Sequence, residues 1–273
     1  SMRLRGPLVA LSTGLGLVLV LTPYIWIVLT SFKTRVDAFA IPPKIVFSPT
    51  LSNYRLAFVD GDFTRNLVNS LIVATASTAV ALIAGVPAAY SLTRFRMRGN
   101  TAFLFFLLAA RLFPALVLSV PLFVFFTKQG MTNSFLPVVL AHITFQLPFV
   151  VWMMRGFFAG VPTAIDEAAI IDGCGALGAF VRTVLPLTLG GLAATAIFCV
   201  INSWNEFLFA LVLTSRDTAT VPVAIPGLLS PIGTQWGEIA AVGTVATIPV
   251  LIFALLAQRY IVRGMTGGAL GGE

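Results

Sequence analysis

The chain has 273 residues, of which 58% are hydrophobic and 10% are charged, and its mean hydropathy is +0.98. A soluble domain is about half apolar and about a quarter charged, so this composition indicates an integral membrane protein with one helical bundle. We interpret the net charge of +7 as a membrane-topology signal and not as nucleic-acid binding. Cys174 and Cys199 suggest no disulfide or metal framework, and Ser1 before Met2 is interpreted as an expression scar.

Long apolar segments recur along the chain and predict an all-α membrane fold with six transmembrane helices, at roughly 8–31, 68–92, 101–126, 136–157, 186–213 and 239–258. The first segment could also be a cleaved signal peptide. It is long, lacks a small-residue cleavage site and carries Tyr24 and Trp26 near its outer end, which favours an uncleaved span. The chain, 1–273, is therefore interpreted as a single transmembrane domain.

Basic residues favour an orientation with both termini in the cytoplasm. Arg94, Arg96 and Arg98 crowd into one short turn, TRFRMRG, and short loops carry the strongest positive-inside signal. Counted over all loops and termini, the inner segments hold nine basic residues and the outer segments hold seven, which is a small difference. The inner ones are Arg3, Arg5, Arg94, Arg96, Arg98, Arg155, Arg182, Arg259 and Arg263, and the outer ones are Lys33, Arg35, Lys44, Arg55, Arg65, Lys128 and Arg216.

Prolines punctuate both the loops and the spans. The outer loop 32–67 is predicted to be ordered without forming a domain of its own. Prolines within the predicted spans each remove a helix hydrogen bond and permit a kink. Kinked helices suit a bundle that rocks between two states, although static membrane bundles contain prolines too. These residues are Pro87, Pro114, Pro121, Pro148 and Pro249.

The segment 159–185 is predicted to form two short helices with a sharp bend. Thr163 can cap the first helix, with Asp166 at its third position as in a capping box. Gly173 is a natural stop, because glycine adopts the left-handed conformation without a steric penalty. A second helix at roughly 176–184 would lead to Pro186, which can open the next span.

The charges of this segment indicate what it contacts. Asp166, Glu167 and Asp172 are acidic, and no Lys or Arg lies between Thr163 and Val181. A helix resting on anionic lipid headgroups is usually basic, so a protein partner is favoured over lipid. An ordinary loop that packs on its own bundle remains an alternative. Small and apolar residues offer a smooth face for close approach, namely Ile165, Ala168, Ala169 and Ile170.

One motif in this segment resembles the EAA loop of permease subunits of ABC importers. The match consists of Glu167-Ala168-Ala169, Gly173 and Val184-Leu185-Pro186, with Thr183 in place of the usual Ile and Cys174 in place of the common Ala. The resemblance implies a coupling helix that docks in a groove of the ATP-hydrolysing subunit. The residues implied in this coupling are Asp166, Glu167, Ala168, Ala169, Asp172 and Gly173.

Further stretches, at 69–99, 113–123, 203–214 and 258–273, resemble the MalG-type permeases of carbohydrate ABC importers. This resemblance implies a multi-pass permease of the bacterial inner membrane. Its implied partners are a second homologous permease chain, an ATPase dimer, an extracytoplasmic solute-binding protein that faces loop 214–238, and a carbohydrate substrate. The tail departs from the family pattern at Gly271, Gly272 and Glu273, which puts a tail contact with the ATPase in question.

The sequence predicts no covalent chemistry and no cofactor in this chain. It has no GxxxxGK[ST] phosphate loop, so ATP and Mg²⁺ are expected on a partner ATPase. His142 is the single histidine, which excludes a two-histidine metal site within the chain and favours a hydrogen-bonded packing role.

Polar residues within spans are costly and mark either a pathway or a pair. We expect Arg111 and Glu206 to face the bundle interior and to neutralise each other or charges of a partner subunit; alternatively, Glu206 sits at the outer headgroup level. Asn202, Trp204 and Asn205 are further candidates for the translocation path, because amides and aromatic rings bind sugar hydroxyls and stack on sugar faces.

Two other functional classes remain compatible with these residues. An ion-coupled secondary transporter would use an interior acid such as Glu206 and usually an inverted repeat, which is not apparent. A non-transporting membrane scaffold would need only the acidic loop. Within the permease interpretation the solute stays open among maltodextrins, trehalose-like disaccharides, monosaccharides and glycerol phosphates.

Overall fold

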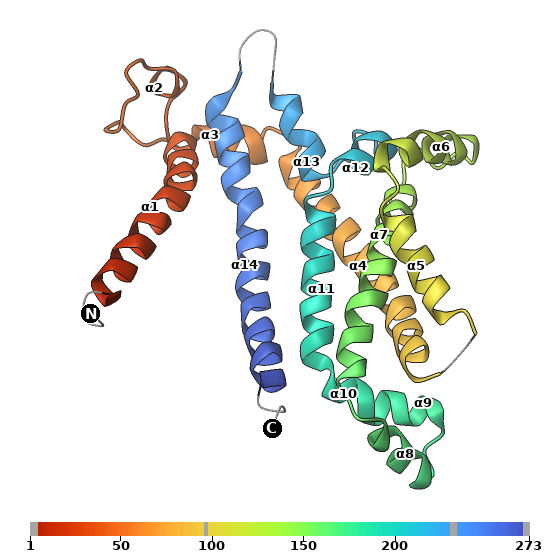
Figure 1. The fold of residues 1–273 in the computed structure, drawn as a ribbon. Coiled ribbons are helices and arrows are strands. Elements are labelled where there is room, and N and C mark those ends of the chain that lie inside the picture. The colour runs from red at the N-terminus through yellow and green to blue at the C-terminus, as the bar shows by residue number, and fades with distance from the viewer. Residues whose placement is uncertain (1–4, 96–97, 230–233, 270–273) are drawn as a thin grey trace. The chain divides into compact units, whose positions relative to one another are not determined.

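The computed structural model describes residues 5–95, 98–229 and 234–269, and within these ranges the regular structure is helical, with no strand (Figure 1). The predicted all-α fold is confirmed. Ser1, Arg96, Gly233 and the terminal Gly271–Glu273 lie outside the described residues. The longer helices are α1 (Arg5–Ser31), α4 (Phe63–Arg94), α5 (Asn100–Arg111), α6 (Ala115–Lys128), α7 (Leu136–Ala159), α8 (Thr163–Ile171), α11 (Leu189–Trp204) and α14 (Trp236–Ala269).

Shorter helical segments connect them. These are α2 (Arg35–Ala38), α3 (Ser52–Phe58), α9 (Ala176–Ala179), the π-helix η1 (Phe180–Val184), α10 (Leu185–Leu187), α12 (Leu208–Leu213), α13 (Val221–Ala224) and the 3₁₀ turn η2 (Ile225–Leu228).

In the described part of the chain, four helices are long and apolar enough to cross a membrane, and six spans result if each of two bent helix pairs counts as one. The four lie at Leu11–Ser31, Phe63–Arg94, Leu136–Ala159 and Trp236–Gln258. The bent pairs are Asn100–Arg111 with Ala115–Lys128, at 85°, and Ala176–Leu187 with Leu189–Trp204, at 78°.

The two bends modify the predicted spans 101–126 and 186–213. Pro114 is the N-cap of α6 with extended backbone angles, and a proline pushes the residue before it, Phe113, out of the helical region. The first bend therefore falls at Phe113–Pro114. The second falls at Thr188, so that Pro186 lies within the short helix α10 before the bend and does not open α11.

Four other prolines do not break their helices. Pro87, Pro121, Pro148 and Pro249 lie inside α4, α6, α7 and α14, as does Pro23 inside α1. Each lacks the N–H group of a helix hydrogen bond, and membrane helices tolerate such gaps.

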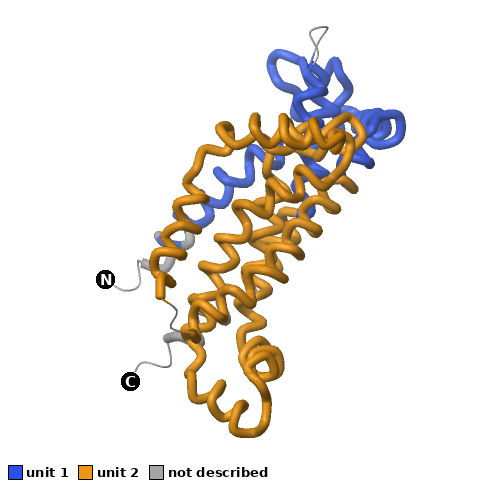
Figure 2. Tube along the Cα trace, turned by 90° about the vertical axis from the view of Figure 1, so that its right-hand side faces the viewer, with its two compact units in different colours: residues 1–67, 224–249 blue, residues 68–223, 250–273 orange. Residues whose placement is uncertain are grey.

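The chain forms two compact units, which are described separately (Figure 2). Unit 1 contains 1–67 and 224–249. Its outer loop is ordered by Asn53, whose amide donates to the carbonyls of Ser31 and Lys33, each at 2.8 Å. Lys33 is buried with its ammonium 4.1 Å from the Trp26 ring centre. Hydrogen bonds from Lys44 and Thr34 lower the pKa of Asp37 in the same loop.

Unit 2 contains 68–223 and 250–273, and its buried core surrounds α7. One cluster, around Val150, Met154 and Phe158, joins α7 to α4 and to the segment after α8. A second cluster, around Val138 and Phe209, joins α7 to α6 and α12. Within unit 2, α8 and α9 lie at one end and α6 and α12 at the other (Figure 1).

Candidate functional site

The α8–α9 loop has the predicted bend, but its first helix begins differently. Pro162 occupies the N-cap position of α8 and no side chain caps the helix, so the predicted capping role of Thr163 is wrong. The C-terminal end agrees with the prediction. Gly173 has φ of +88°, and the N–H groups of Gly173 and Cys174 donate to the carbonyls of Ile170 and Ala169. This is the Schellman arrangement, which requires a left-handed residue after the helix.

Asp166 does not complete a capping box and instead fixes α8 to α4. The Tyr90 hydroxyl donates to one carboxylate oxygen at 2.5 Å, and the Arg94 Nε lies 2.9 Å from the other. The side chains of Arg94 and Asp166 are only 8% and 11% exposed. Arg94 also donates to the Val161 carbonyl at 2.8 Å, just before α8. A buried ion pair of this kind fixes geometry, because removing either partner leaves the other charge buried without compensation.

Aromatic rings complete this anchor. The Tyr90 ring lies 4.6 Å from that of Phe180 and 5.7 Å from that of Phe158, centre to centre. These rings come from α4, η1 and α7, so both ends of the α8–α9 loop pack on the same tyrosine. The loop is therefore held by its buried side.

The opposite side of α8 is exposed, and we call it the coupling surface. It combines two acids with small and apolar residues and consists of Glu167, Ala168, Ile170, Ile171 and Asp172. Of the predicted apolar face it contains Ala168 and Ile170, whereas Ile165 packs against the core. Of the predicted coupling residues, Asp166 and Ala169 are buried against the bundle instead. Asp166 thus positions the surface and Glu167 belongs to it.

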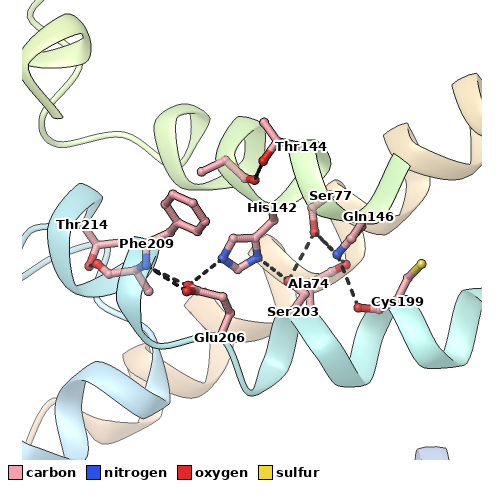
Figure 3. Close-up of polar contacts among 12 residues, drawn as sticks. Ala74, Ser77, His142, Thr144, Gln146, Cys199, Ser203, Glu206, Phe209 and Thr214 are labelled. Atoms are coloured by element: carbon pink, nitrogen blue, oxygen red, sulfur yellow. Dashed lines mark hydrogen bonds and ion pairs between the residues drawn. The ribbon is translucent and has the colours of Figure 1, made fainter. Parts of the chain in front are cut away.

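A second group of polar side chains, the buried polar network, crosses the interior of unit 2 (Figure 3). Gln146 donates to the Ser77 hydroxyl at 3.2 Å, and that hydroxyl lies 3.3 Å from the Ser203 hydroxyl. His142 Nδ1 lies 2.6 Å from the same Ser203 oxygen, and its Nε2 lies 3.2 Å from Glu206. The network links α4, α7 and α11, and His142 is a hydrogen-bonded packing residue as predicted.

Glu206 and Arg111 do not form the predicted ion pair. The Glu206 carboxylate accepts hydrogen bonds from the N–H groups of Phe209 and Ala210, at 2.8 and 3.0 Å, in addition to its contact with His142. It therefore caps the N-terminus of α12. The Arg111 guanidinium lies 5.0 Å from the centre of the Phe149 ring.

Arg111 and Glu206 nevertheless line one pocket of about 370 Å³ in unit 2. Thr144, Phe145 and Phe209 also line it, and the last two rings are stacked at 6.3 Å. The pocket combines a cation, a carboxylate, a hydroxyl and aromatic faces.

The remaining path candidates lie elsewhere. Trp204 is buried in the core, whereas Asn202 and Asn205 are exposed, and the Asn205 amide donates to the Ile201 carbonyl at 2.8 Å. None of the three lines the pocket described above.

Sequence reasoning missed five residues that organise these sites, namely Ser77, Tyr90, Arg94, Gln146 and Ser203. A signal was present for Ser77 and Gln146, since both are polar residues in the middle of apolar segments.

Comparison with known proteins decides the family. Residues 77–267 match the family model described as binding-protein-dependent transport system inner membrane component.

The chain belongs to this permease family.

The permease is 35% identical to the trehalose/maltose transport system permease protein MalG of Thermococcus litoralis, over 94% of this chain and 93% of the relative. It is also 35% identical to the trehalose transport system permease protein SugB of Mycobacterium tuberculosis, over 92% of this chain and 93% of the relative. The predicted MalG-type membership is confirmed, and the EAA motif at Glu167 is typical of the family.

The fold is shared with solved structures. A chain of a bacterial ABC transporter involved in the import of the acidic polysaccharide alginate superposes with a TM-score of 0.77 and 22% identity, covering 94% of the permease and 96% of that chain. This likeness shows a shared fold, while the family match describes the permease as an inner membrane component of a binding-protein-dependent transport system.

Proposed function

We propose that this chain is one of two permease subunits of an ATP-driven importer for a carbohydrate, in the bacterial inner membrane with both termini in the cytoplasm. A second homologous permease, a dimer of ATPase subunits that bind ATP and Mg²⁺, and an external solute-binding protein complete the importer. Relatives named for trehalose, maltose and diacetylchitobiose transport support the solute class.

The observation that carries the proposal is the two-sided construction of α8. Its buried side is fixed to α4 through Asp166, and its exposed side presents Glu167. A helix held in this way transmits a displacement to the bundle instead of sliding on it. ATPase closure against Glu167 would then move α8 and α4 together.

The buried polar network is the part of the bundle that would change when α4 is displaced. Ser77 is on α4, the helix that carries Tyr90 and Arg94, and its hydroxyl contacts Ser203 of α11. Displacement of α4 would change this contact, and the pocket at Glu206 lies at the far end of the same network. The path through the membrane would follow this side of unit 2.

The test uses charge reversal on the coupling surface. We expect Glu167→Lys to abolish co-purification of the ATPase and uptake of saccharide, while the thermal stability of the permease is unchanged because Glu167 is exposed. Asp60→Lys, in the outer loop and half-exposed, is the matched control and is expected to have no effect. ATPase attachment that survives Glu167→Lys would overturn the coupling role.

Energy coupling is tested separately. Uptake by the wild-type complex is expected to continue in the presence of a protonophore and to stop when ATP is depleted. The reverse result would identify an ion-coupled secondary transporter.

A further inference from the structure

Arg111 carries a charge that the described part of this chain does not neutralise. It ends α5 at the bend before α6, in a bent helix pair that is long and apolar enough to count as one membrane span. No carboxylate among the described residues forms an ion pair with it. An arginine at membrane depth faces protein or a water-filled cavity and requires compensation.

The contacts that Arg111 does have leave its hydrogen-bonding edge free. Its guanidinium lies 5.0 Å from the Phe149 ring centre, a distance typical of a cation–π contact. Such a contact uses the face of the guanidinium, whereas the planar fork of N–H groups remains available for a carboxylate, sulfonate or phosphate.

The nearest acid in the same pocket is already occupied. Glu206 accepts hydrogen bonds from two backbone N–H groups and contacts His142, so its charge is compensated without Arg111. The pocket therefore contains the Glu206 carboxylate, which already has its hydrogen-bond partners, and the Arg111 guanidinium, which has no ion-pair partner among the described residues.

The remaining walls suit a sugar ring. The half-buried Phe145 ring, which is backed by the buried Phe209 ring at 6.3 Å, provides aromatic surface, and the Thr144 hydroxyl, which donates to the Ala141 carbonyl at 2.6 Å, can still accept a hydrogen bond. A volume of about 370 Å³ lies within the range of small-molecule sites.

We propose that Arg111 binds the negatively charged group of an acidic saccharide in this pocket as the solute crosses the membrane. This inference rests on the proposed function and narrows its solute class to anionic carbohydrates. An acidic residue of the second permease chain is the competing partner for Arg111, and the experiment separates the two.

The experiment measures ATP-dependent uptake by the complete importer with matched pairs of disaccharides, one neutral and one carrying a carboxylate at C6. We expect the wild type to prefer the acidic members. Arg111→Gln is expected to lower uptake of the acidic members about tenfold or more relative to uptake of the neutral members, as for loss of a charge-assisted hydrogen bond. Arg111→Lys is expected to retain part of the preference, because a point charge cannot form the two-pronged contact.

Lys128→Gln is the control, since it removes a positive charge at the end of α6 outside the pocket. It is expected to leave the acidic-to-neutral ratio unchanged. Co-purification of the second permease chain is measured in parallel, and its loss in Arg111→Gln with equal loss of both uptakes would overturn the inference in favour of a subunit contact.

Two further outcomes are decisive. Wild-type uptake of neutral disaccharides without a preference for acidic ones would overturn this inference and leave the proposed function standing. Absence of ATP-dependent uptake for every saccharide would overturn the proposed function itself.

Discussion

Arg94 and Asp166 form a buried ion pair, 2.9 Å apart, between α4 and α8. The two residues are 72 positions apart in the sequence, and their contact joins the α8–α9 loop to α4.

Removal of the Asp166 carboxylate should strongly destabilise the permease. Asp166→Ala is expected to lower the free energy of unfolding by about 3–5 kcal/mol, because it leaves the buried Arg94 charge without a partner. Tyr90→Phe removes one hydrogen bond to a carboxylate and is expected to cost about 1.5–3 kcal/mol. Denaturant titration in detergent micelles measures both. The double variant Arg94→Leu/Asp166→Leu should cost less than the sum of its single changes, and strict additivity would contradict the pairing.

The bend after α8 should depend on the absence of a side chain at Gly173. Gly173→Ala is expected to cost about 1–2 kcal/mol, because φ is +88° while no atom lies within 4 Å of an added Cβ, so the penalty is purely conformational. Gly173→Asn should cost less, since asparagine tolerates the left-handed region. Gly156→Ala has equal space at ordinary φ, and its stability should not fall. Equal losses for Gly156→Ala and Gly173→Ala would argue against the conformational explanation.

Two members of the buried polar network should respond differently to apolar replacement. His142→Phe removes one hydrogen-bond partner from the Ser203 hydroxyl and one from the Glu206 carboxylate, and it is expected to cost about 2–3 kcal/mol. Gln146→Met removes two long hydrogen bonds together with an amide oxygen that has no partner, so a change below about 1 kcal/mol is expected. Thermal unfolding of the purified variants gives the comparison, and a larger loss for Gln146→Met would contradict it.

Neighbouring glycines of α11 should give effects of opposite sign. A Cβ at Gly191 would overlap the Phe157 ring, so Gly191→Ala is expected to cost about 1–3 kcal/mol by forcing α7 and α11 apart or rotating the ring. Gly190 has no atom within 4 Å of an added Cβ, and Gly190→Ala should gain up to about 1 kcal/mol of helix propensity. Melting temperatures in the same detergent check the difference. A loss for both would show that α11 tolerates no added volume.

The sequence predicted those features that depend on local chemistry. The left-handed turn at Gly173 follows from the conformational freedom of glycine, and the exposure of Glu167 follows from an acidic segment that lipid would repel. The helical spans followed from apolar length. These predictions needed no knowledge of what the segment packs against.

Features that depend on distant partners were not predictable. Nothing near Asp166 indicates Tyr90 or Arg94, so a capping role was the available local interpretation, and it was wrong. The expected pair of Arg111 with Glu206 failed for the same reason, because the backbone N–H groups of α12 and the His142 ring had already satisfied Glu206. The bend at Pro114 agrees with the kink that the sequence allowed there, whereas the bend at Thr188 had no such signal and was hidden in the hydropathy of the predicted span.

The Tyr90 and Arg94 anchor also limits how such proteins can be recombined. If loop 159–185 were replaced by that of a relative, the new loop would carry its own acid at the position of Asp166. It would lack the α4 side chains with which that acid pairs in the relative. Functional chimaeras should therefore exchange loop 159–185 together with the part of α4 that carries Tyr90 and Arg94. A graft of the loop alone would lack this anchor, so a displacement of the loop would not be passed to the spans.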